Sequence, residues 1–351
     1  MIKVSKRKQS ELALNPCFTA LSALVTLAKC ERGDLMSLFF TEQNFTEALE
    51  KNIKPALLSC RRECTFRGYD QKPLYTVQYT ASDPRGTVFI LHGFSETADK
   101  YLELIYYFLQ QNLSVLIYDQ RGHGRSPRTA PLAVTHIDRF EEYVEDFEAC
   151  IAAFSDTLPR PFYLYAHSMG GAVAALYLEK GTDAFKKAVL SSPMIAPRHD
   201  GLFLWASLAV CRLFSLLGKS KRCLFVAKKD YSTEPFEESS ALSPARFESY
   251  RTLRRQNEML RGGSPTYGWS FVSLGVTKHI LKKGAPERIR TPFRIYSAEL
   301  DHLVRREPQE TLAARAPKGE FLLVPQCKHE IYAANDEILH PHLAELLDYF
   351  Q

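Results

Sequence analysis

Residues 162–171 read Phe-Tyr-Leu-Tyr-Ala-His-Ser-Met-Gly-Gly, an apolar and aromatic run that passes through a serine into small residues. The pattern predicts a buried strand, a sharp turn at Ser168 and a helix that begins at Met169. Strand and helix approach each other closely at such a turn, so the residues two before and two after the serine must be small. Ala166 stands where glycine is usual, one methyl group larger. The turn aims the Ser168 hydroxyl away from the sheet, which makes this serine a candidate nucleophile.

Two backbone N–H groups are candidates for holding an oxyanion. The Met169 N–H lies at the positive end of the helix that follows the serine. The second comes after the apolar run 86–91, another expected buried strand, which ends in His92-Gly93-Phe94-Ser95. A strand that ends in His-Gly before a helix supplies a donor from the next residue, here Phe94. We interpret His92 itself as a structural histidine of the turn.

Candidates for a base and its orienting acid follow two later strands. The strand expected over 293–298 is followed by Glu299 and Asp301, and the last one, over 320–325, precedes His329. The sequence favours Asp301 as the acid and keeps Glu299 as the alternative. The order serine, acid, histidine is typical of one class of serine hydrolase.

These residues suffice for acyl transfer. A serine hydroxyl is a poor nucleophile near neutral pH and needs a base. His329 would take the proton of Ser168 and later protonate the leaving alcohol, while Asp301 would hold the imidazole tautomer. No metal or organic cofactor is implied. An intact triad with both oxyanion donors argues against a non-catalytic binding protein.

The chain resembles the bacterial lysophospholipases and their relatives the monoacylglycerol lipases, within the α/β-hydrolase superfamily, from about residue 40 to the end. The resemblance is carried by Ala-His-Ser-Met-Gly-Gly at 166–171, Ser-Pro-Met at 192–194, Asp-Gln-Arg-Gly-His-Gly-Arg-Ser at 119–126, His-Ile-Asp-Arg-Phe at 136–140, Pro-Thr-Tyr-Gly-Trp at 265–269 and Lys-His-Glu-Ile at 328–331. One departure is Arg305-Arg306, where many relatives carry an acid.

The resemblance implies a serine carboxylic-ester hydrolase that releases a fatty acid from single-chain glycerolipids, with a lysophospholipid as the first choice of substrate. A monoacylglycerol lipase or a general esterase is the alternative. A dehalogenase would need an acid at position 168, and a proline iminopeptidase would usually show Gly-Pro-Gly after His92-Gly93; neither feature is present.

Length and pattern predict one large α/β domain. A chain of 351 residues with 45% hydrophobic residues can bury a core of that size. Strands alternate with helices, which predicts a mostly parallel sheet covered on both faces. The expected strands lie near 65–69, 73–81, 86–92, 113–119, 162–167, 187–191, 291–298 and 320–325, and the expected helices at 99–111, 138–155, 169–180, 307–316 and 338–350.

The interval between Pro193 and Arg290 interrupts this alternation and is too long for a simple connection. We expect a helical cap over the active site there, at about 196–288. Its apolar stretch 202–217 is too short to span a bilayer and is followed by Lys219, Lys221 and Arg222. Three interpretations stay open: a helix packed on the core, a lid that binds the acyl chain, or an interfacial helix that gives peripheral contact with a membrane.

A second cap segment carries Arg251, Arg254, Arg255 and Arg261. The plainest interpretation is a solvated helix face, and the alternative is contact with a phosphate headgroup. The formal net charge of +5 is mild, and the chain shows no motif of nucleic-acid recognition.

The N-terminal residues allow three interpretations. Residues 1–35 contain basic residues before an apolar run, and Met36 lies where relatives begin. This segment is a mis-start or extension, a membrane-associating segment or a cleaved signal; the hydrolase domain is expected over 36–351. Eight cysteines in a chain of this length form neither a disulfide scaffold nor a zinc pattern and suit a cytoplasmic protein, with peripheral attachment to the inner membrane left open.

Overall fold

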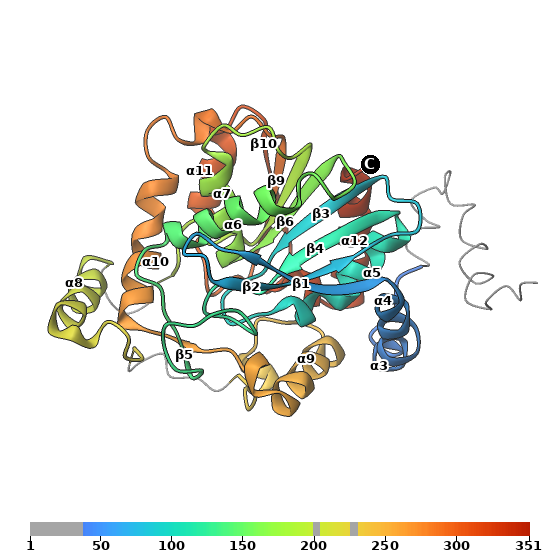
Figure 1. Cartoon of the computed structure of the whole chain (residues 1–351), viewed down its shortest axis with the longest axis horizontal. Helices are drawn as coiled ribbons and strands as arrows, with labels where there is room; N and C mark the ends of the chain where they lie inside the picture. The colour runs from blue at the N-terminus through green and yellow to red at the C-terminus, as the bar shows by residue number, and fades with distance from the viewer. Residues whose placement is uncertain (1–37, 199–203, 225–230) are drawn as a thin grey trace, which may run out of the picture. The chain divides into compact units, whose positions relative to one another are not determined.

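An eight-stranded sheet forms the centre of residues 40–351 in the computed structural model, which describes residues 38–198, 204–224 and 231–351 (Figure 1). The strand order is β1-β2-β4-β3-β6-β7-β9-β10, with β1, β2 and β4 antiparallel in turn and the other neighbours parallel. The strands are β1 (Arg61–Arg67), β2 (Pro73–Tyr79), β3 (Gly86–Leu91), β4 (Leu113–Tyr118), β6 (Phe162–His167), β7 (Lys187–Ser191), β9 (Phe293–Ala298) and β10 (Gly319–Val324). The mostly parallel sheet predicted from the sequence is confirmed.

Helices occupy most of the segments between the strands. They are α3 (Phe45–Ala48), α4 (Lys54–Cys60), α5 (Leu102–Gln110), α6 (Glu141–Phe154), α7 (Met169–Leu178), α8 (Leu204–Phe214), α9 (Pro244–Gln256), α10 (Tyr267–Ile280), α11 (Arg306–Arg315) and α12 (Asp336–Tyr349). A π-helical turn, Leu49–Ile53, joins α3 to α4, and another, Ser215–Lys219, follows α8. Short 3₁₀ turns lie at Ala98–Tyr101, Phe236–Glu238, Glu258–Leu260, Pro286–Arg288 and Ile331–Ala333.

Successive side chains of the strands pack against helices on opposite faces of the sheet. In β6, Phe162 belongs to the core that includes side chains of α6, α7 and α11. Its neighbour Tyr163 instead meets Phe350, just after α12, with the ring centroids 5.0 Å apart. Tyr165 lies 6.4 Å from Phe108 of α5. The six residues of β6 are therefore all buried, as a strand covered on both faces requires.

The first part of the chain differs from the sequence-based expectation in three elements. Strand β1 begins at Arg61 instead of near 65, because its first half, Arg-Arg-Glu-Cys, pairs only with β2 at the edge and has no apolar pattern to reveal it. The helical segment from Phe45 to Cys60 was not predicted, although Ile53 and Leu57 are fully covered. The helix expected at 99–111 begins as a 3₁₀ turn.

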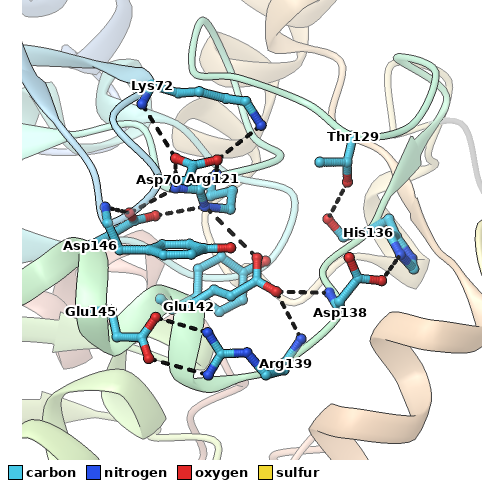
Figure 2. A network of polar contacts seen from close by, with 12 residues as sticks. Asp70, Lys72, Arg121, Thr129, His136, Asp138, Arg139, Glu142, Glu145 and Asp146 are labelled. Atoms are coloured by element: carbon cyan, nitrogen blue, oxygen red, sulfur yellow. Dashed lines mark hydrogen bonds and ion pairs between the residues drawn. The ribbon is translucent and has the colours of Figure 1, made fainter.

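Arg121 joins the loop after β4 to two other segments (Figure 2). Its guanidinium donates to both carboxylate oxygens of Asp70 (2.9 and 2.8 Å), in the β1–β2 connection, and of Asp146 (2.9 and 2.8 Å), in α6. It also lies 4.5 Å from the ring of Tyr69. Burial opposes ionisation of Asp70, but Arg121 outweighs it and holds the pKa of Asp70 well below its usual range. Arg121 of the 119–126 motif therefore has a structural role, since it holds the β1–β2 connection and α6 together.

The segment between β7 and β9 contains α8, α9, α10 and the short strand β8 (Ser264–Pro265), which pairs in parallel with β5 (Val134–Thr135). Thr266 caps α10 by accepting a hydrogen bond from the Trp269 N–H (3.1 Å), and His136 contacts the Thr266 hydroxyl (2.8 Å). No helix in the described ranges is long and apolar enough to cross a membrane. The expected N-terminal extension, residues 1–35, lies outside the described residues.

Candidate active site

Ser168 occupies a strained turn between β6 and α7, with φ 51° and ψ −116°. A residue with a β-carbon rarely adopts a positive φ, and such backbone strain concentrates at functional sites. The close approach of α7 to β3 depends on Gly170, because a β-carbon there would lie 2.4 Å from the Leu91 carbonyl oxygen. Ala166 is completely buried. The small residues predicted around the serine therefore have a steric cause.

A chain of two hydrogen bonds joins Ser168, His329 and Asp301. The His329 Nε2 lies 2.8 Å from the Ser168 Oγ, and its Nδ1 lies 2.6 Å from an Asp301 carboxylate oxygen. The other Asp301 oxygen accepts from the N–H groups of Leu303 (2.8 Å) and Val304 (3.0 Å). Ser168, His329 and Asp301 are 9%, 2% and 7% exposed in that order, so the hydrogen bonds are shielded from water. The arrangement can move a proton from a serine hydroxyl to an imidazole.

Opposing effects set the pKa values of His329 and Asp301. Burial lowers the pKa of His329, but the Asp301 charge and hydrogen bond outweigh it, so the pKa lies above the usual 6.5. Burial raises the pKa of Asp301, and His329 with the two backbone N–H groups brings it below its usual value. Asp301 is therefore ionised near neutral pH and stabilises a protonated His329.

Glu299, the alternative acid, is exposed. Its carboxylate accepts a hydrogen bond from the Gln326 N–H (2.8 Å). The acid that contacts His329 is Asp301.

The two N–H groups expected to hold an oxyanion donate no hydrogen bond within the described part of the chain. Met169 is the first residue of α7, so its N–H has no acceptor in the helix, and Phe94 lies in the loop after β3. The Phe94 ring packs on Trp269 of α10 at 4.2 Å, and the Trp269 indole donates to the Tyr143 hydroxyl (3.2 Å). The 265–269 segment thus supports the loop that carries Phe94.

His92 is buried and neutral at the base of this loop. Its Nδ1 contacts the Gly93 carbonyl (2.7 Å) and its Nε2 accepts from the Gln120 N–H (2.8 Å). Burial lowers its pKa to about 4. These contacts agree with its interpretation as a structural histidine.

Ser168 and His329 line a cavity of about 690 Å³, a size typical of ligand-binding clefts. Most of the wall is apolar and includes Phe45, Leu49, Met194, Leu253, Leu339 and Leu343. Charged side chains line it as well, among them Lys100, Arg254, Glu96 and Glu330. The cavity can accept a molecule that has both an apolar and a polar part.

The family model described as serine aminopeptidase, S33 (Hydrolase_4) matches residues 82–336. The chain belongs to this family of α/β-hydrolases. It is 31% identical to the probable lysophospholipase L2 of Haemophilus influenzae over 264 residues, which cover 72% of this chain and 80% of that protein. It is 28% identical to lysophospholipase L2 of Escherichia coli K12 over 316 residues, covering 83% and 87%.

Among solved structures, a soluble variant of monoglyceride lipase from Saccharomyces cerevisiae in complex with a substrate analog matches with a TM-score of 0.65. The alignment covers 83% of this chain and 97% of that one at 16% identity, so it supports the shared fold. The chain is a carboxylic ester hydrolase with the α/β-hydrolase fold.

Glu96 is a buried residue of the site that the sequence reasoning missed. Its carboxylate accepts four hydrogen bonds: from the Gly93 N–H (2.7 Å), the Tyr101 hydroxyl (2.6 Å), the Lys100 ammonium (2.9 Å) and the Tyr332 hydroxyl (2.6 Å). Lys100 also donates to Glu330, next to His329, at 2.6 Å. The sequence signal, a Glu and a Lys four residues apart, is the same as that of an exposed helical ion pair.

The cap arginines divide into buried and exposed members. Arg254 is only 5% exposed and lines the cavity, so the solvated-face interpretation is wrong for this residue. The side chains of Arg255 and Arg261 are 49% and 43% exposed. The helical period places residues 254 and 255 about 100° apart, so one points inward and the other outward.

The apolar helix α8 is largely exposed. Among its described residues only Cys211 is buried, while Trp205 is 71% and Leu213 54% exposed. Leu216, in the following turn, is 75% exposed. Phe214 stacks on Tyr267 of α10 at 4.3 Å, which attaches the segment to the domain. The segment thus packs on α10 and also leaves large apolar side chains exposed, so all three interpretations of it stay predictions.

Proposed function

We propose that the protein hydrolyses the acyl ester of lysophospholipids, with Ser168, His329 and Asp301 as the catalytic triad. The observation that carries the proposal is the hydrogen-bonded chain of these three residues beside a cavity of about 690 Å³, whose lining includes Ser168 and His329 together with apolar and charged side chains. The lysophospholipase names of the two relatives support the choice of substrate.

The chemistry runs in two halves. The Ser168 oxygen attacks the acyl carbonyl carbon while its proton passes to the His329 Nε2, 2.8 Å away. The N–H groups of Phe94 and Met169 hold the oxyanion, and His329 then gives its proton to the departing glycerophospho-alcohol. Water, deprotonated by His329, attacks the acyl-enzyme, releases the fatty acid and restores the serine hydroxyl.

The walls of the cavity suit a lipid with one acyl chain. Burial of each methylene group contributes about 0.8 kcal/mol, so the apolar lining residues favour a long chain over a short one. The charged lining residues suit a polar headgroup. A monoacylglycerol would use the same triad and the same apolar lining residues, and it differs by the absence of the phosphate.

Helix α8 with the turn after it provides a surface for peripheral contact with a membrane. The exposed side chains Trp205, Leu213, Leu216 and Leu217 are apolar, and Arg212, Lys221 and Arg222 on the same segment are also exposed. Apolar residues flanked by basic ones are typical of segments that lie in the interface of anionic bilayers. Because lysophospholipids reside in such membranes, this contact would bring the enzyme to its substrate.

The test is hydrolysis of lysophosphatidylethanolamine and of monoacylglycerol with the same acyl chain, measured as released fatty acid in the same mixed micelles. The parent enzyme should show the higher kcat/KM on the lysophospholipid, and Ser168→Ala should be inactive on both. Higher efficiency on monoacylglycerol would identify a lipase instead. Activity confined to short soluble esters would reject a lipid substrate.

A further inference from the structure

The inner face of α9 is built from two arginines and a tyrosine. Arg246, Tyr250 and Arg254 are spaced four residues apart, so they lie on one face of the helix, and all three are buried. Each arginine is 5% exposed. A guanidinium withdrawn from water to this degree requires anionic or hydrogen-bonding partners.

Arg246 has a full set of partners. It forms ion pairs with Glu103 of α5 (2.8 Å) and with Asp336 at the start of α12 (3.0 Å). It also donates to the Phe40 carbonyl (3.0 Å). These contacts attach the beginning of α9 to the domain, so Arg246 has a structural role.

Arg254 has no carboxylate partner among the described residues. Its Nη2 donates to the Ser95 carbonyl (2.6 Å), and the guanidinium stacks on Tyr250 (4.4 Å) and Tyr231 (5.1 Å). Its Nε is buried, and no residue in the described ranges accepts a hydrogen bond from it. The two arginines thus share a helix face and a degree of burial, and differ in that only Arg246 is neutralised by direct ion pairs.

Two acidic groups act electrostatically on Arg254, and both are already engaged in other contacts. Glu96 accepts four hydrogen bonds, and Glu330 pairs with Lys100 at 2.6 Å. Both carboxylates favour the charged form of Arg254 at longer range. They keep the guanidinium ionised and leave its donors available for an anion that enters the cavity.

The position of Arg254 relates it to the leaving group of the reaction. Ser95, which accepts its hydrogen bond, directly follows Phe94, whose N–H is proposed to hold the oxyanion. Arg254 and Ser168 line the same cavity. A charged group attached to the glycerol of the substrate is only a few bonds from the acyl carbonyl. When the carbonyl is bound at Ser168, that group would therefore lie close to the loop that carries Phe94 and Ser95.

We infer that Arg254 binds the phosphodiester of a lysophospholipid and so sets the preference for phospholipid over neutral glyceride. The inference rests on the proposed lipid esterase function. A guanidinium presents parallel N–H donors that match two phosphate oxygens. The aromatic rings of Tyr250 and Tyr231, over which it lies, restrict the orientation of the Arg254 guanidinium.

The test compares three variants on three substrates. Arg254→Gln should raise the KM for lysophosphatidylethanolamine roughly 10- to 100-fold, the range expected for a lost charge-assisted hydrogen bond. The KM values for monoacylglycerol of equal chain length and for p-nitrophenyl butyrate should change less than about twofold, because neither substrate carries a phosphate. Arg254→Lys should recover part of the loss. Arg255→Gln, at the exposed neighbour, is the matched control and should behave as the parent.

Each outcome is decisive. An equal loss on all three substrates would overturn the inference, since Arg254 would then only hold the Ser95 loop. A parent that cleaves neither lipid would refute the proposed function instead. If Arg254→Gln does not fold, inhibition of the parent gives the answer: glycerophosphoethanolamine should compete with p-nitrophenyl butyrate and glycerol should not. Absence of competition, or equal competition by inorganic phosphate, would overturn the assignment to a headgroup.

Discussion

The Tyr332 hydroxyl donates a hydrogen bond to the Glu96 carboxylate at 2.6 Å, and this contact joins the loop of His329 to the loop of Phe94. The two residues are 236 positions apart in the chain. The Glu96 carboxylate also holds the Gly93 N–H, next to Phe94, and Lys100 crosses to Glu330, next to His329. The proposed base and the proposed oxyanion donor are therefore held by one buried polar network.

The contribution of this network can be measured with two tyrosines that donate to the same carboxylate at 2.6 Å. Tyr332→Phe and Tyr101→Phe should each lower the free energy of unfolding by roughly 1.5–3 kcal/mol, because each leaves a charged acceptor short of a donor. Only Tyr332 connects the two loops, so its variant should show the greater fall in kcat. Urea unfolding and steady-state kinetics check both quantities; equal kcat values for the two variants would contradict a positioning role.

The triad should act as a unit. Ser168→Ala and His329→Ala should each lower kcat by roughly 10⁴-fold or more, and the double variant should lose little further activity. A fluorophosphonate probe, which reacts with activated serines, should label the parent and fail to label Ser168→Ala. Labelling that persists in this variant would place the nucleophile elsewhere.

The pH profile should reveal the coupling of His329 to Asp301. Catalysis needs neutral His329, so kcat/KM should fall as the pH drops through its pKa, which lies above 6.5. Asp301→Asn removes the two largest effects that raise this pKa, while burial, which lowers it, remains. The activity of this variant is expected to be reduced about 10⁴-fold. The acid limb of its pH profile should lie at lower pH than that of the parent. Glu299→Gln, at an exposed carboxylate, should keep the parent profile.

Two glycines give opposite expectations for stability. In Gly170→Ala the new β-carbon would lie 2.4 Å from the Leu91 carbonyl oxygen, so strand and helix must separate, at a cost of roughly 1–3 kcal/mol or more. In Gly275→Ala, inside α10, it meets nothing within 4 Å and should stabilise the protein by roughly 0.5–1 kcal/mol. Thermal unfolding of the two variants decides the signs.

The surface of α8 should mediate binding to anionic vesicles. Leu213→Glu/Leu216→Glu should weaken sedimentation with phosphatidylglycerol vesicles by at least about tenfold, since each leucine would otherwise be buried in the interface. Added salt should weaken binding by the parent through screening. Activity on p-nitrophenyl butyrate should be retained.

The matched control for this surface is Leu58→Glu, in α4. Leu58 is 72% exposed, about as much as Leu216, and lies outside the α8 segment. Its variant should bind vesicles as the parent does. Equal loss of binding by both variants would mean that the effect is nonspecific.

The fold and the proposed catalytic residues were accessible from the sequence because their signals are local. Buried parallel strands read as short apolar runs, and the elbow places small residues at fixed distances from Ser168. Asp301 and His329 each follow such a strand, and the carboxyl ends of parallel strands share one edge of the sheet. Their order in the chain was therefore enough to expect the hydrogen-bonded chain that the structure contains.

The tertiary structure alone decided the surroundings of these residues. Arg254 and Arg255 are chemically identical neighbours, yet one lines the cavity and the other is half exposed. The partners of Glu96 come from positions 93, 100, 101 and 332. Whether a charged side chain is solvated or buried depends on contacts between segments distant in the chain, and the free energy of burying it depends on those contacts. A local pattern carries the periodicity of a helix, and packing determines which of its charges meet the cavity.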